Sequence, residues 1–355
     1  MSALKPQVVV VTGASAGVGR ATVREFGNRG ARIGLVARGR DALEAARADV
    51  EAAGGTALVL PTDVADCAQV EAAAEAVERE LGPIDVWVNN AMVSILAPLD
   101  RVTPEEFRRV TEVTYLGYVW GTMAALKRMR PRGRGHIVQV GSALAYRSIP
   151  LQAAYCGAKH AIRGFTESVR CELLHDRSRV RISIVELPGV NTPQFEWIRN
   201  RMPNKSQPIG TVYQPEVAAR AIVWAAHHDR RELYVGTPTV QAVLADKLAP
   251  GLMDHYMAGT VYDGHQTDEP DDPNRPDNLM QPLAGDHGAH GPFDERAKDR
   301  SIQLWAATHR GWLTVAGVAL AAVLARLWTS RDRDAQLRTL LGGTRLRGPG
   351  KLLRR

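Results

Sequence analysis

The segment TGASAGVGR, Thr12 to Arg20, follows the apolar run QVVVVT and precedes a helical pattern. Its glycines permit a tight turn and a close approach of the backbone to a phosphate, whose charge the N-terminal amides of the helix would meet. Three glycines alone are a weak signal, but a position between a strand and a helix favours a dinucleotide site. The residues expected to hold a cofactor here are Gly13, Ser15, Gly17, Val18 and Gly19.

Outward from this turn, short apolar runs alternate with longer helical patterns. The runs are continuously hydrophobic, which indicates strands buried on both faces, and helical crossovers imply parallel pairing. The sequence therefore predicts an α/β fold, a doubly wound parallel sheet of about seven strands, that is, a Rossmann fold. The expected strands are residues 7–12, 32–37, 57–61, 84–89, 135–141, 181–187 and 232–236.

Composition divides the chain into four parts. Residues 1–262 carry the strands and helices of the expected fold. Residues 263–300 contain five prolines and ten acidic residues, which predicts an extended or disordered linker. Residues 301–328 are expected to form a hydrophobic helix, and residues 329–355 form a basic tail.

The hydrophobic segment leaves two interpretations open. Its largely apolar run, from Gly311 to Ala325, is 15 residues long and is followed by Arg326. A spanning helix needs about 20 apolar residues. The run is apolar but short for a span. We expect membrane association through residues 311–328, either by spanning or by interfacial insertion. The alternative is a helix that docks on the protein or covers a dimer contact.

Charge and cysteine usage exclude several classes of protein. The net charge of +7 equals that of residues 326–355, so the rest of the chain is neutral, which argues against nucleic acid as a partner. The three cysteines show no paired spacing, which argues against a disulfide framework or a metal site. The N-terminus resembles no signal peptide. We expect a cytoplasmic catalytic domain.

The end of the second expected strand bears on the choice of dinucleotide. The strand ends LVARGR, with Arg38 and Arg40 and with no acidic residue before Asp41. An acidic residue there would bind a ribose 2′-hydroxyl, whereas a basic one suits a 2′-phosphate. NADP(H) is therefore favoured over NAD(H), and Arg38 is the residue expected to bind the 2′-phosphate. The alternative is that Arg38 is a solvated residue after a strand.

A tyrosine and a lysine lie four residues apart in the helical segment AAYCGAKHAIRGF, residues 153–165. Residues at this spacing share one face of a helix, so Tyr155 and Lys159 would be neighbours. A phenol has a pKa of about 10, and a nearby ammonium favours its ionised form. Tyr155 could then act as a general acid or base, with Ser142 stabilising charge on a substrate oxygen. Taken singly, each residue could instead be structural.

Four motifs in this order resemble the short-chain dehydrogenase/reductase family, over residues 1–240. They are TGxxxGxG at residues 12–19, NNA at residues 89–91, Ser142, and YxxxK at residues 155–159. The resemblance implies hydride transfer between a nicotinamide and a carbonyl or secondary alcohol, and it implies a homo-oligomer. It also implies that Lys159 binds the nicotinamide ribose. Further cofactor residues implied by the resemblance are Asp63, Val64, Asn90, Pro188, Gly189 and Thr192.

Two positions depart from the family pattern. Met92 stands where the family usually has glycine after NNA, which could alter the backbone there. Thr114 stands where the family has the asparagine of a proton relay. Thr114 is expected to serve that relay, and we count it as a catalytic residue with Ser142, Tyr155 and Lys159. The alternative is a catalytically weakened dinucleotide-binding scaffold or a redox-responsive regulator.

The substrate side is expected in residues 194–214, beyond the sixth strand. Phe195, Trp197, Met202 and Tyr213 give this segment an apolar and aromatic character. That suits a hydrophobic carbonyl or alcohol. The alternative, a lid that packs on its own core, stays open.

Overall fold

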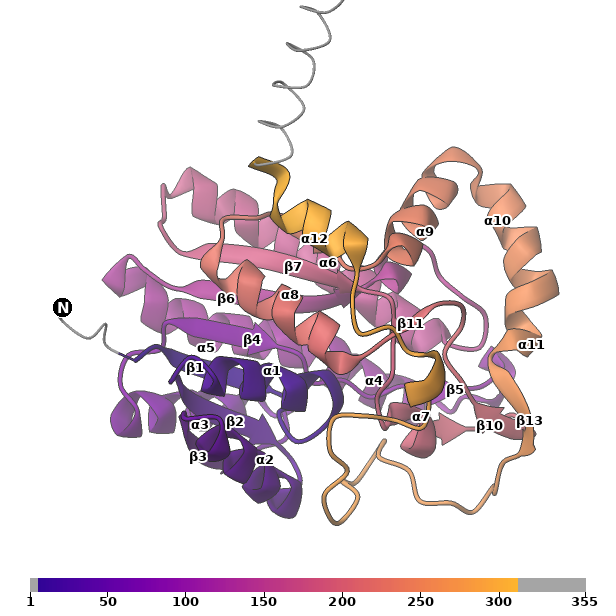
Figure 1. Ribbon diagram of the computed structural model, residues 1–355, viewed down its shortest axis with the longest axis horizontal. Helices are drawn as coiled ribbons and strands as arrows, with labels where there is room; N and C mark the ends of the chain where they lie inside the picture. Colours follow the sequence, from indigo (N-terminus) through magenta and orange to yellow (C-terminus); the bar gives the residue numbers. More distant parts are fainter. Residues whose placement is uncertain (1–5, 312–355) are drawn as a thin grey trace, which may run out of the picture. The chain divides into compact units, whose positions relative to one another are not determined.

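The sheet of the protein is parallel throughout, as the sequence predicts. The computed structural model describes residues 6–311, and its main sheet has seven strands in the order β12-β7-β6-β4-β1-β2-β3 (Figure 1). Continuous burial explains the parallel pairing, since all five residues of β1 are buried. The strands are β1 (Val8–Thr12), β2 (Arg32–Ala37), β3 (Thr56–Pro61), β4 (Val86–Asn89), β6 (His136–Ser142), β7 (Arg181–Leu187) and β12 (Glu232–Tyr234).

Helices cover both faces of this sheet. On one face α1 (Gly17–Gly27) packs against α2 (Arg40–Ala52) and α8 (Pro215–His227). On the other face α3 (Cys67–Glu80) packs against α5 (Gly117–Arg132), which contacts α6 (Ala153–His175). The remaining helices are α4 (Pro104–Thr111), α7 (Gln194–Trp197), α9 (Thr237–Leu248), α10 (Pro250–Tyr256), α11 (Tyr262–Gly264) and α12 (Ile302–Thr308).

Parallel pairing brings the carboxyl ends of the strands to one edge. β1 pairs with β2 and β4, and β6 pairs with β4 and β7. Thr12, Asn89 and Ser142 therefore end neighbouring strands at the same edge of the sheet, which is where doubly wound folds bind ligands. Short strands near the site are β5 (Ile95–Leu96), β8 (Gly189–Val190), β9 (Arg199–Asn200), β10 (Asn204–Ser206), β11 (Val212–Tyr213) and β13 (Gln266–Pro270).

The acidic segment 263–300 packs against the sheet-bearing part of the chain. Its strand β13 pairs antiparallel with β10, and Figure 1 shows the segment, in orange, returning from β13 past α7 toward α12. The compact unit that contains the sheet extends to Leu304, beyond the boundary predicted at residue 262. The prolines and acidic residues of segment 263–300 keep the segment irregular. Buried Leu279 and several ion pairs nevertheless hold it in place. Composition alone did not reveal these contacts.

The expected membrane segment lies almost entirely outside the described residues. Within residues 6–311, no helix has the length and apolar character needed to cross a membrane. Residues 312–328 and the basic tail are not described.

Candidate active site

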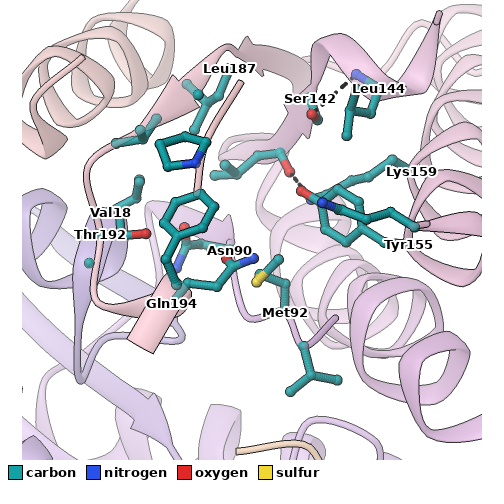
Figure 2. Close-up of a pocket in the computed structure, with 18 of the residues that line it drawn as sticks. Val18, Asn90, Met92, Ser142, Leu144, Tyr155, Lys159, Leu187, Thr192 and Gln194 are labelled. Atoms are coloured by element: carbon teal, nitrogen blue, oxygen red, sulfur yellow. Dashed lines mark hydrogen bonds between the residues drawn. The ribbon is translucent and has the colours of Figure 1, made fainter. Parts of the chain in front are cut away.

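A cavity of about 660 Å³ opens at the carboxyl edge of the sheet. Its size is within the usual range for a small-molecule or cofactor site. It gathers residues from the loops after β1, β2, β3, β4, β6 and β7 and from α6, and Figure 2 shows its central part. The predicted site residues that line it are Gly13, Ser15, Gly17, Val18, Arg38, Asp63, Val64, Asn90, Ser142, Tyr155, Lys159, Pro188, Gly189 and Thr192.

The glycine turn is shaped by contacts that leave no room for side chains. Gly13 has φ +68°, and a Cβ there would lie 2.8 Å from the Cα of Ala91. A Cβ on Gly19 would overlap the carbonyl oxygen of Gly13. The turn therefore folds back tightly before α1, and Gly17 and Val18 at the start of that helix line the cavity. This is a cradle that a cofactor phosphate fits.

The NNA motif joins two strand ends at this turn. Asn90 donates from its side-chain amide to the carbonyl of Thr12 at 3.0 Å, and its backbone N–H donates to the Thr12 hydroxyl at 2.9 Å. Asn89 is fully buried, accepts from Trp87 at 2.8 Å and donates to Gln139 at 2.8 Å. The motif thus fixes the end of β4 against the end of β1.

Met92 lines the cavity without an unusual backbone. Among residues 6–311, the only non-glycine residues with positive φ are Leu151 and Arg177. Position 92 therefore does not need the conformational freedom of glycine in this chain. The departure from the family pattern adds a side chain to the cavity wall, as Figure 2 shows.

Tyr155, Ser142 and Lys159 lie together on one side of the cavity (Figure 2). The Lys159 ammonium lies 5.5 Å from the centre of the Tyr155 ring, as one helical turn requires. Burial raises the pKa of Tyr155, and a hydrogen bond with the Ser142 hydroxyl lowers it. Ser142 also accepts from the backbone N–H of Leu144 at 3.2 Å, which fixes its side chain at the end of β6.

Lys159 is held from behind by a tyrosine that the sequence did not single out. Its ammonium donates to the carbonyl of Val140 at 2.7 Å and to the hydroxyl of Tyr118 at 3.2 Å. Tyr118 is itself buried and donates to the same carbonyl at 2.9 Å. Burial lowers the pKa of Lys159 to about 7, although Glu186 raises it. Burial therefore disfavours the charged form of this lysine, and the carboxylate of Glu186 opposes that effect.

Glu186 is a second site residue that the sequence analysis missed. Its carboxylate is fully buried on β7, neither oxygen has a hydrogen-bond partner among residues 6–311, and a Cβ on the adjacent Gly141 would overlap it. Burial raises its pKa to about 8, while Lys159 lowers it. The available signal was an acidic residue in the interior of the apolar strand RISIVEL, because buried carboxylates concentrate at functional sites.

The substitution Glu186→Gln should flatten the pH dependence of stability. A folded pKa of about 8, against an ordinary value near ~4.3, means that the folded state binds more protons between these values. The free energy of unfolding should therefore fall as pH rises from about 5 to about 8. Lys159, with a lowered pKa, acts in the opposite direction only above pH ~7. Thermal unfolding at several pH values measures the difference.

The matched control is Glu172→Gln, at an exposed position of α6. It should leave the dependence of the melting temperature on pH as in the parent chain. If Glu186→Gln also leaves it unchanged, the carboxylate does not titrate in this interval.

Thr114 lies in a π-helical turn, Glu112–Leu116, between α4 and α5. Its hydroxyl donates to the carbonyl of Val93 at 2.8 Å and accepts from the Val93 N–H at 3.1 Å. Single π-turns are frequent at functional sites. The side chain therefore holds the loop after β4, which contributes Val93 to the cavity wall. Gly19 does not line the cavity either. It lies against Gly13, which does.

We call the side of the cavity where Arg38 would bind a 2′-phosphate the adenosine side. Two arginines make polar contacts there, one with a carboxylate and one with backbone carbonyls. Asp63 accepts from Arg109 of α4 at 2.7 Å, so this acidic residue is paired. Arg38, at the end of β2, donates to the carbonyl oxygens of Asn278 and Met280 at 2.5 and 3.0 Å. Segment 263–300 therefore takes part in the site at the position that the sequence assigned to a 2′-phosphate.

The substrate side is apolar, but its residues differ in part from those expected. Phe195 and Trp197 line the cavity, as do several residues of α9 and two of α10. Met202 instead packs with Leu96 and Ile198, and Tyr213 is buried beneath Gly236. Expected residues therefore include two that pack in the core. The apolar residues contributed by α9, α10 and the turn after α10 are Ala242, Ala245, Met253, Tyr256, Met257 and Val261.

Comparison with known proteins agrees with this geometry. Residues 7–202 match the short chain dehydrogenase family. An uncharacterized oxidoreductase of Bacillus subtilis is 33% identical over 288 residues, which cover 80% of each chain. The 3-dehydrosphinganine reductase of Danio rerio is 32% identical over 228 residues, 61% of this chain and 67% of that one.

The fold is also similar to that of a solved structure. A metagenomic short-chain oxidoreductase in complex with NADP is 29% identical, with a TM-score of 0.55 over 64% of this chain and 96% of that one. The chain belongs to the short-chain dehydrogenase/reductase family of oxidoreductases.

Proposed function

We propose that this protein is an NADP(H)-dependent oxidoreductase that interconverts a carbonyl and a secondary alcohol on a hydrophobic compound. The observation that carries the proposal is the meeting of Tyr155, Ser142 and Lys159 in the cavity that also contains the glycine cradle. When bound, NADP(H) would supply or accept the hydride at the substrate carbon.

The protein's own residues would handle the proton and the oxygen. Tyr155 would give its proton to the carbonyl oxygen during reduction and take it back during oxidation. Ser142 would donate a hydrogen bond to the same oxygen. Lys159 would favour the phenolate by its charge when protonated, and Tyr118 and Val140 orient it. Thr114 would support this relay as a positioning residue, through the loop at Val93.

A second candidate function is a dinucleotide-binding scaffold or redox-responsive regulator with faded chemistry. Thr114 and Met92, the departures from the family pattern, favour it. Turnover separates the two candidates, because a scaffold binds nucleotide but does not consume it. A panel of carbonyls and alcohols, followed by NADPH absorbance beside NADH, is the direct test.

Arg38 should decide the preference for NADP(H). Hydrogen bonds to a charged group contribute about 1.5–3 kcal/mol, so Arg38→Ala should lower the ratio of kcat/KM for NADPH over NADH at least about tenfold. Arg40→Ala is the matched control, since Arg40 is exposed and pairs only loosely with Glu44 at 3.8 Å. An unchanged ratio in Arg38→Ala, or a parent enzyme that prefers NADH, would contradict this role.

The apolar cavity wall supports a bulky hydrophobic substrate. Side chains of α9 and α10 line this end of the cavity, and the related Danio rerio enzyme is named for a sphingoid ketone. We propose a lipid, steroid-like or aromatic carbonyl compound. kcat/KM should rise with the apolar size of the ketone. The free energy of transition-state binding should improve by about 25 cal/mol for each Å² of apolar surface that the substrate buries.

Membrane association through residues 311–328 and homo-oligomerisation remain part of the proposal. Because residues 263–300 pack on the catalytic part, a chain ending at residue 310 is the right comparison with the full chain. The full chain should sediment with membranes and the shortened chain should not. Equal distribution of both would argue for the alternative, a helix that docks on protein.

A further inference from the structure

One stretch of the acidic segment, residues 278–288, crosses the loops that the sequence assigned to the cofactor. We call it the strap. Its first anchor is Arg38, which donates to the carbonyls of Asn278, Leu279 and Met280 at 2.5, 3.4 and 3.0 Å. Arg109 also donates to the Leu279 carbonyl at 3.2 Å. The Leu279 side chain is fully buried in the main core, so this end of the strap is fixed.

The second anchor is the glycine turn itself. The backbone N–H of Gly17, at the start of α1, donates to the carbonyl of Gly288 at 3.0 Å. Arg20 of α1 is buried and donates to the carboxylate of Asp286 at 2.9 Å. The strap is therefore held at both the phosphate-binding turn and the end of β2.

Between these anchors the strap forms part of the cavity wall. Asn278, Pro282, Leu283 and His287 line the same cavity as Arg38, Asp63 and Val64. At Gly39, just beyond β2, a Cβ would lie 3.6 Å from the Cβ of Pro282. The strap thus lies directly against the predicted adenosine side.

We propose that the strap is the outer wall of the adenosine side of the cofactor site, and that it must open for the nucleotide to enter or leave. The inference rests on the proposed function for the identity of the nucleotide. It adds a binding element, outside the family motifs, that controls cofactor exchange.

The structure of the strap suits such a movement. Within the described chain, residues 271–293 contain no helix or strand, so opening breaks no ladder of backbone hydrogen bonds. It breaks instead the contacts of Gly288, Asp286 and Met280 with α1 and Arg38. Several such bonds, some charge-assisted, must break together, which makes opening slow enough to limit exchange.

A disulfide between positions 39 and 282 tests the proposal. The separation of 3.6 Å between the two Cβ positions matches disulfide geometry, and Gly39 has an ordinary φ of −80°. The variant is Gly39→Cys with Pro282→Cys, made with Cys67→Ser and Cys171→Ser because both native thiols are exposed. NADPH is bound first, the protein is oxidised, and release is followed by stopped-flow fluorescence against excess NADP⁺.

Release from the oxidised variant should be at least about tenfold slower than from the same variant after reduction, which is its own control. Oxidation before NADPH is added should slow binding in the same way. Asp286→Ala should accelerate release, whereas Asp268→Ala, a matched charge removal in β13, should not. Equal release rates in the oxidised and reduced forms, or failure of the disulfide to form, would overturn the proposal that the strap controls cofactor exchange. Failure of every variant and the parent to bind NADPH would overturn the proposed cofactor as well.

Discussion

Replacing Tyr155 by phenylalanine should lower kcat for a carbonyl substrate by about 10²–10⁴-fold. The substitution removes the acidic proton and leaves the ring in the cavity wall beside Ser142 and Lys159. NADPH affinity should stay within a few-fold of the parent. Steady-state turnover and nucleotide titration, measured on the same preparation, check the two parts separately.

The matched control for this prediction is Tyr115→Phe. Tyr115 lies in the π-helical turn and stacks edge-on with Phe165, away from the cavity lining. Its loss of a hydroxyl should leave kcat unchanged. If the parent chain is no faster than Tyr155→Phe with every carbonyl and alcohol tried, the scaffold function is favoured. Thr114→Asn would then show whether restoring the family's relay residue restores turnover.

The second large effect is expected for Gly19→Ala. The added Cβ would overlap the carbonyl oxygen of Gly13 and lie 2.8 Å from the side-chain amide of Asn90. Both atoms belong to the turn that holds the ends of β1 and β4 together, so the turn must shift. Overpacking of this kind costs about 1–3 kcal/mol of stability. NADPH binding should be lost or weakened by more than the stability change alone explains.

Gly164→Ala is the control, because it makes the same Gly→Ala change at a helix position where a Cβ has room. Gly164 is at an exposed position of α6, and no atom of the described residues is within 4 Å of a Cβ there. Alanine in a helix should be neutral or stabilising by up to about 1 kcal/mol. Thermal unfolding and nucleotide titration compare the two variants. An unshifted melting temperature with intact binding in Gly19→Ala would contradict the tight fit of the turn.

The fold was predictable because its signals are local. Each strand of the sheet is a short, continuous apolar run, and each run lies within a few residues of its predicted range. The π-helical turn at Thr114 and the burial of Tyr118 were not predictable, since both depend on packing between α5, α6 and β6. Hydrophobic periodicity reports which face is buried but not which polar atoms meet inside.

The candidate site was predictable where a motif carries the chemistry. Fourteen of the predicted residues line one cavity, including Ser142, Tyr155 and Lys159. Glu186 and the strap were missed for different reasons. Glu186 joins the site only because β7 pairs with β6 and places its carboxylate over Gly141. The strap has the composition of a linker, so its contacts with Arg38 and Gly17 could not be read from it.

The sequence by itself determined the family, the parallel α/β sheet, the glycine turn and the tyrosine–lysine pair, because these depend on residues close together in the chain. The tertiary structure alone decided that Lys159 faces Tyr118 and Glu186, and that Arg38 is held by residues 278–280. Those contacts join residues separated by up to 242 positions. Only the closing of the fold brings such residues together, and burial then sets their hydrogen bonds and pKa values.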